Sequence, residues 1–113
     1  MIEINLNVAG CGFRYDALVQ VFLRWSEQQP VSLTLLPEPD NQFDPNAVAV
    51  VAIWPGGAPI HFGYIPKTDS ERTTRAFNEC RIKGVELLRC GLSGGGKRGG
   101  WAKIRLNVEP KAK

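Results

Sequence analysis

The chain has 113 residues, of which 43% are hydrophobic and 22% are charged, a composition typical of one globular domain. No apolar stretch reaches the roughly 20 residues that a membrane-spanning helix needs, and the N-terminus does not resemble a signal peptide. We therefore expect a cytoplasmic protein with no membrane contact, with a single domain over residues 1–109 and a short basic tail over residues 110–113.

The net charge of +3 is distributed unevenly along the chain. Residues 1–66 carry two basic and six acidic side chains, whereas residues 67–113 carry twelve basic and five acidic ones. A segregated positive charge predicts a polyanionic partner, because phosphates are attracted to basic surfaces and release counterions on binding. A basic surface that only maintains solubility is the alternative.

The three cysteines, Cys11, Cys80 and Cys90, are far apart in the sequence, and His61 is the only histidine. No CxxC or HxxxH pair is present, and such pairs are the usual beginning of a zinc site. We therefore expect free thiols in the core of a protein from a reducing compartment, without a metal or another cofactor.

The first half of the chain predicts one helix among short strands. Residues 2–8 alternate between apolar and polar, as in a half-buried strand. Residues 10–15 then form a connector, and Asp16 is expected to cap a helix that extends to about Gln28. A second strand follows over residues 31–35.

Turn-forming residues dominate the segment 37–46, which predicts an unusually long loop for so small a domain. The nearly continuous apolar segment 47–54 predicts a strand that is buried on both faces, and a fourth strand is expected at 60–65.

The second half predicts a helix and two further strands. Thr68 and Glu71 fit a capping box, and Gly84 is expected to end the helix. Strands follow at 85–92 and 101–109, with a basic glycine-rich loop between them. Three residues of the helix are expected to face inward: Ala76, Phe77 and Cys80. On the last strand, the residues expected to face inward are Ala102, Ile104, Leu106 and Val108.

The predicted fold is therefore mainly β with two helices, an α+β chain in the order β-α-β-β-β-α-β-β. Short, sequential strands of this kind favour a small six-stranded OB-like β-barrel over a parallel sheet.

No group of residues has the pattern of a catalytic site. His61 has no nucleophile at motif spacing, and the segment GGGKRGG lacks the order of a phosphate-binding P-loop. Asp40 and Asp44 could hold a divalent cation for hydrolysis, but aspartates in such loops usually cap backbone amides, which we expect of Asp40. We therefore predict that the chain is not an enzyme.

Aromatic and basic residues instead alternate on the connectors. Arg14 precedes Tyr15, Phe43 lies in the long loop, and Tyr64 precedes Lys67. Single-stranded nucleic acid is bound by this combination, because bases stack on rings while cations hold phosphates. The alternative is that Phe43 and Tyr64 plug the ends of the barrel.

Two segments carry a resemblance to a known family. EPDNQFDPNAVAVV at residues 38–51, followed by FGYIPK at residues 62–67, resembles the HIRAN domain, the DNA-end-binding module of certain fork-remodelling helicases. The resemblance covers nearly the whole chain. It implies a six-stranded OB-like barrel that captures the 3′ end of single-stranded DNA.

The resemblance also implies roles for single residues. Arg14 would grip a phosphate, while Tyr15 and Phe43 would sandwich the terminal base. Asp44 would accept a hydrogen bond from the 3′-hydroxyl group, and Lys67 would contact a phosphate.

At other positions the resemblance gives a less specific indication of function. Asn41 matches a residue that shapes the loop, and Tyr64 stands where some members carry histidine. Where fork-remodelling members stack a second base, the late loop of this chain has no aromatic residue, and Trp101 is the candidate substitute. Lys97 and Arg98 are candidates for additional DNA contacts.

The sequence thus predicts a DNA-binding module for single-stranded 3′ ends in DNA repair or replication-fork processing, without a small-molecule substrate. A subunit that docks on a helicase or nuclease is the leading alternative. A pocket formed by Tyr15, Phe43 and Asp44 that is open and lined with cations would favour DNA, and inward-packed rings would favour a protein partner.

Overall fold

The computed structural model of the chain describes residues 1–94 and 98–111. Within these residues the elements are β1 (Ile2–Asn7), the 3-10 helix η1 (Cys11–Arg14), α1 (Tyr15–Ser26), β2 (Ser32–Pro37), β3 (Val48–Ile53), β4 (Ile60–Tyr64), α2 (Lys67–Asn78), β5 (Ile82–Leu92) and β6 (Gly100–Val108). The predicted α+β class and the predicted order of strands and helices are confirmed.

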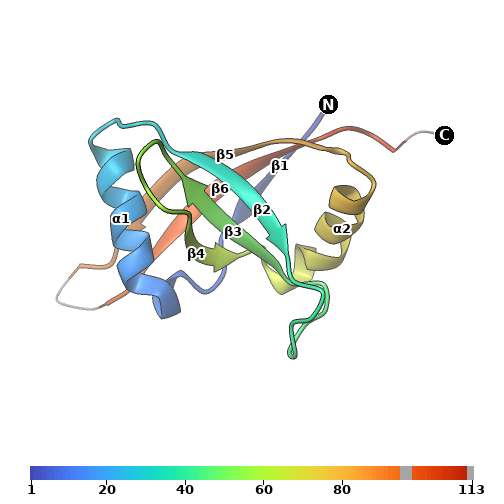
Figure 1. Cartoon of the computed structure of the whole chain (residues 1–113), viewed down its shortest axis with the longest axis horizontal. Coiled ribbons are helices and arrows are strands. Elements are labelled where there is room, and N and C mark those ends of the chain that lie inside the picture. Colours follow the sequence, from blue (N-terminus) through green and yellow to red (C-terminus); the bar gives the residue numbers. More distant parts are fainter. Residues whose placement is uncertain (95–97, 112–113) are drawn as a thin grey trace.

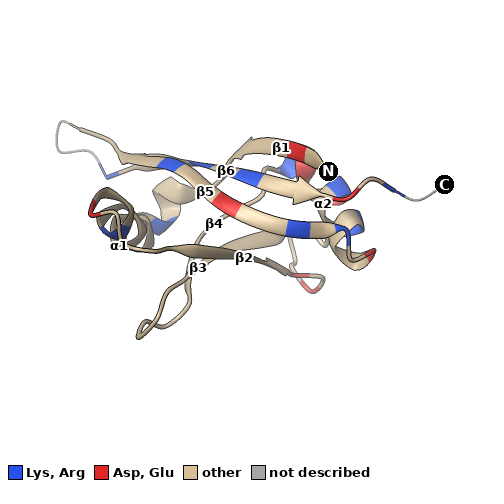
Figure 2. Cartoon of the chain, turned by 90° about the horizontal axis from the view of Figure 1, so that it is seen from above, with Lys and Arg blue, Asp and Glu red and all other residues tan. Residues whose placement is uncertain are grey.

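The strands form two antiparallel sheets of three strands each, in the orders β1-β6-β5 and β2-β3-β4. The sheets lie in separate layers, and α1 and α2 lie at opposite ends of the molecule (Figures 1 and 2). A closed barrel is not found in residues 1–94 and 98–111, so the predicted barrel closure does not appear.

The two sheets are joined where the chain leaves β1. Ala9 and Tyr64 exchange two backbone hydrogen bonds, with N···O distances of 2.7 and 2.8 Å. Gly63 makes this approach feasible, because a Cβ atom there would clash with the Val8 side chain and would lie 2.7 Å from the carbonyl oxygen of Ala9. The joint fixes Tyr64 at the edge of β4.

The core lies between the sheets. Val48–Ala52 of β3 are all buried, which confirms a strand covered on both faces. On β6 the predicted inward residues are also confirmed, because the alternation in the sequence matches the period of a strand. None of the described helices is long and apolar enough to span a membrane.

The start of α1 differs from the prediction. Gly10, at φ 79°, leads into η1, and α1 follows directly at Tyr15, so Tyr15 lies on the helix rather than on a connector. Asp16 lies within the first turn and is not the N-cap; its carboxylate accepts a hydrogen bond from Arg98 instead.

The predicted capping box of α2 is wrong. The helix begins at Lys67 after Pro66, whose side chain cannot cap it. Thr68 donates to the Asp69 carboxylate, and Glu71 accepts from Arg75 one turn later.

The helix ends also differ from the prediction. α2 ends at Asn78, and Gly84 lies within β5. Cys80 has a positive φ of 58°, and the amides of Cys80 and Arg81 donate to carbonyl groups of the last turn. This is a Schellman motif in which cysteine takes the usual place of glycine. Cys80 is consequently exposed and Phe77 is 38% exposed, so the prediction that they face inward is wrong.

Candidate nucleic-acid interface

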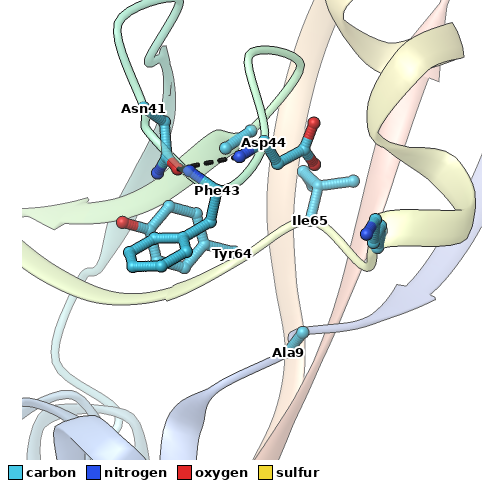
Figure 3. Close-up of a pocket in the computed structure, with 8 residues that line it drawn as sticks. Ala9, Asn41, Phe43, Asp44, Tyr64 and Ile65 are labelled. Atoms are coloured by element: carbon cyan, nitrogen blue, oxygen red, sulfur yellow. Dashed lines mark hydrogen bonds between the residues drawn. The ribbon is translucent and has the colours of Figure 1, made fainter.

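A cleft of about 360 Å³ opens between the 38–47 loop, the end of β4 and the start of α2. Five residues predicted from the sequence line this cleft together with Ala9, Ala47 and Ile65 (Figure 3). The five are Asn41, Phe43, Asp44, Tyr64 and Lys67. We call it the first cleft.

Phe43 is 92% exposed at the first cleft, although phenylalanine usually buries its ring. This exposure contradicts the alternative that Phe43 plugs an end of the fold. The ring is therefore free to be covered by a ligand.

Asn41 shapes the loop that carries Phe43. Its Oδ1 accepts hydrogen bonds from the backbone amides of Phe43 at 2.8 Å and Asp44 at 3.0 Å, the second of which is drawn in Figure 3. Its Nδ2 donates to Oε1 of Glu38 at 3.1 Å. These bonds hold the loop in one conformation, so that an exposed ring is presented on a fixed backbone.

Asp44 joins the loop to α2. Its Oδ1 accepts from the Asn46 amide at 2.9 Å, and its Oδ2 accepts from the hydroxyl group of Ser70 at 3.2 Å. Thr74 of α2 adds a bond to the carbonyl oxygen of Asn46 at 2.9 Å. The carboxylate is half-buried at the cleft and can still accept hydrogen bonds, because an ionised carboxylate has about four acceptor sites.

The amide caps in this loop come from Asn41 and Asp44, and among the described residues none comes from Asp40, contrary to the expectation for that residue. No group of three or more potential metal ligands is found in the described part of the chain.

Tyr64 forms the boundary of the first cleft. Its hydroxyl group donates to Oε1 of Glu38 at 2.9 Å, and burial together with this carboxylate raises the pKa of the phenol. The guanidinium group of Arg14 lies 5.7 Å from the centre of the ring, and the His61 ring packs edge-on at 4.7 Å.

A second cleft of about 410 Å³ adjoins Tyr64 through Arg14 and His61, which pack against the Tyr64 ring. It is lined by Gly12, Phe13, Arg14, Tyr15, Asp16, Ala17, His61 and Arg98. The guanidinium group of Arg98 lies 5.0 Å from the centre of the Tyr15 ring and also pairs with Asp16 at 3.0 Å. Tyr15 and Phe43 thus line different clefts, although the resemblance expects them to sandwich one base.

The basic residues after position 66 do not form one continuous basic face. Figure 2 shows Lys and Arg interleaved with Asp and Glu on the strands of the upper layer. Most of these cations form ion pairs within 4 Å: Arg72, Arg75, Arg81, Lys83, Arg98, Arg105 and Lys111. The ion pairs of the described residues do not include Lys67, which is exposed beside the first cleft.

Two further predicted contacts lie elsewhere. Trp101 is 41% exposed but lines neither cleft, and its ring covers the backbone of Gly91 instead. Lys97 lies outside the described residues.

Sequence reasoning missed the residues that position the site. Glu38 and Ser70 each bond to a partner 26 positions away, so local patterns could not identify these contacts. Glu38 nevertheless belongs to the segment that carries the family resemblance. Phe13 and His61 are visible in the sequence as one aromatic residue and the single histidine, but no pattern around them assigns either residue to a cleft.

Comparison of the chain with protein-family models, with curated proteins and with solved structures returned no significant match.

Proposed function

We propose that the chain binds the 3′ end of single-stranded DNA in the first cleft and has no catalytic activity of its own. The observation that carries this proposal is the 92% exposed ring of Phe43, held on a hydrogen-bonded loop beside a half-buried carboxylate and an exposed lysine. A ring, an acceptor and a cation are the three groups that a terminal nucleotide requires.

Each group matches one part of that nucleotide. The base stacks on Phe43 and the Tyr64 side of the cleft, because every base offers a π-face to an aromatic ring. The terminal 3′-hydroxyl group donates to the carboxylate of Asp44, which an internal nucleotide cannot do for lack of this donor. The 5′-phosphate of the same nucleotide approaches the ammonium group of Lys67.

The family resemblance supports the same assignment through residues 38–51 and 62–67. On this proposal the two sheets, joined at Ala9 and Tyr64, correspond to an OB-like barrel that is open on its other side. The module would act in DNA repair or replication-fork processing, together with a helicase or nuclease. Docking on such an enzyme without DNA is the competing function, in which the exposed rings of Phe13 and Phe43 would contact protein instead of bases.

The test is a fluorescence anisotropy titration of labelled single-stranded DNA and of a blunt duplex of the same sequence. We expect the single strand to bind more tightly, and Phe43→Ala to weaken its binding by about 1–3 kcal/mol, the usual contribution of one stacked base. Leu23→Ala is the matched control, since Leu23 is an exposed apolar residue of α1 that lines neither cleft. Absence of binding at low salt, or equal affinity of Phe43→Ala and the wild type, would contradict the proposal.

A further inference from the structure

Phe13 is 97% exposed, which makes it the most exposed of the large hydrophobic residues in the described chain. Its backbone is nevertheless fixed, because its amide donates to the carbonyl oxygen of Gly10 at 3.1 Å and its neighbour Cys11 is buried in the core. A ring that stays in water gains free energy when a ligand covers it, and the fixed backbone reduces the conformational entropy that is lost on binding.

The charged groups around Phe13 favour an anionic ligand. The second cleft contains two cations, Arg14 and Arg98, and one anion, Asp16. The pair of Arg98 and Asp16 is exposed, with 69% and 85% of the side chains accessible, and exposed pairs of this kind are weak. Arg98 can therefore exchange the carboxylate for a phosphate group at little cost.

Tyr15 and His61 also face this cleft, and an imidazole is the group that can change its charge near neutral pH. Burial and the neighbouring Arg14 lower the pKa of His61, so the ring is neutral at pH 7. Its Nε2 lies 2.8 Å from the carbonyl oxygen of Gly63 and donates to it, because a carbonyl group can only accept. His61 thus adds an aromatic surface without adding charge.

The two clefts adjoin at the Tyr64 side chain. Tyr64 lines the first cleft, while Arg14, whose guanidinium group lies over the Tyr64 ring, lines the second. His61 contacts the same ring from the second cleft. A strand whose end occupies the first cleft can therefore continue over Tyr64 into the second.

We infer that the second cleft binds the nucleotides immediately upstream of the terminal one, with Phe13 as a stacking surface and Arg14 and Arg98 as phosphate contacts. This inference rests on the proposed function of the first cleft. It makes the ligand a single strand of several nucleotides rather than one terminal nucleotide.

The test compares thymidine 5′-monophosphate, which can occupy only the first cleft, with a thymidine hexanucleotide, both with free 3′-hydroxyl groups, by calorimetric or NMR titration. We expect Phe13→Ala to weaken hexanucleotide binding about tenfold and to leave mononucleotide binding within about twofold of the wild type. Phe43→Ala should weaken both ligands. Because Phe13 is almost fully exposed, its replacement should not change the melting temperature, and Leu23→Ala again serves as the control.

The outcomes separate this inference from the proposed function. If Phe43→Ala weakens hexanucleotide binding but Phe13→Ala does not, the inference is wrong and the proposed function stands. If Phe13→Ala weakens both ligands equally, Phe13 contacts the terminal nucleotide, which also overturns the inference. If the wild type binds neither ligand, the proposed function itself fails.

Discussion

Asp44→Asn separates the two roles that the Asp44 carboxylate can have, as a cap of its own loop and as the acceptor of a terminal hydroxyl group. The side-chain oxygen of the new asparagine can keep the hydrogen bond from the Asn46 backbone amide, which is 2.9 Å long in the wild type. The hydroxyl group of Ser70 lies 3.2 Å from Oδ2 of Asp44 and 3.0 Å from the carbonyl oxygen of Lys67, and it can donate to only one of them. In the variant this hydroxyl group donates to Lys67 and accepts from the new amide group.

The fold should therefore tolerate Asp44→Asn, whereas the ligand loses a charged acceptor. A hydrogen bond to a charged group contributes about 1.5–3 kcal/mol and a neutral one about 0.5–1.5 kcal/mol. The difference of roughly 1–1.5 kcal/mol corresponds to a five- to tenfold loss of affinity for strands with a free 3′-hydroxyl group. Strands with a 3′-phosphate should bind at least as well as before, because one negative charge near the phosphates has been removed.

The assay is an anisotropy titration of both oligonucleotides against the wild type, Asp44→Asn and Asp44→Ala. Asp44→Ala serves as the structural control, because it removes the cap of Asn46 as well and should lower the melting temperature. An equal loss of affinity for both oligonucleotides in Asp44→Asn would show that the carboxylate only caps the loop. An unchanged preference would place end recognition at another residue.

Three further predictions concern other parts of the molecule. In the native chain, only the exposed thiol of Cys80 should react rapidly with a thiol reagent at pH 8, because burial raises the pKa of Cys11 and Cys90 to about 11. All three thiols should react in denaturant. Rapid reaction of more than one thiol in the native chain would refute this prediction. The free energy of unfolding should decrease as the pH falls below about 6.5, because the folded-state pKa of His61 is lowered and the unfolded chain takes up the proton first. Urea titrations at pH 7.5 and 5.5 should show a smaller decrease in His61→Gln, and an equal decrease would exclude His61 as its cause. Asp16→Asn should tighten hexanucleotide binding at low salt by up to about fivefold, because it releases Arg98 and removes a repulsive charge; weaker binding would mean that the ion pair organises the cleft.

The strands were predictable because their patterns are local. The alternation of β6 and the continuous apolar segment of β3 each reflect which faces are buried, and neither depends on distant residues. The long loop at 37–46 was likewise evident from its turn-forming residues.

The helix ends were not predictable from glycine or capping patterns. Both helices end in Schellman motifs whose left-handed positions are occupied by Gln28, at φ 59°, and Cys80, at φ 58°. Non-glycine residues at such positions give no signal in a single sequence, so the second helix was extended to the next glycine.

The candidate site was predictable in part. Its ring, carboxylate and lysine belong to two short segments and were recognised together. The assignment of Tyr15 and Phe43 to separate clefts depends on how η1 packs beside β4, and the support from Ser70 depends on contacts distant in the sequence. Packing of this kind leaves no periodic pattern in the sequence.

The central claim, recognition of a free single-stranded 3′ end, is tested most directly by the wild-type protein with two oligonucleotides. They share one sequence, and one carries a 3′-hydroxyl group where the other carries a 3′-phosphate. A charged hydrogen bond to Asp44 predicts that the 3′-hydroxyl strand binds about tenfold more tightly, or more, at the same salt concentration. Equal affinities, or tighter binding of the 3′-phosphate strand, would contradict the account.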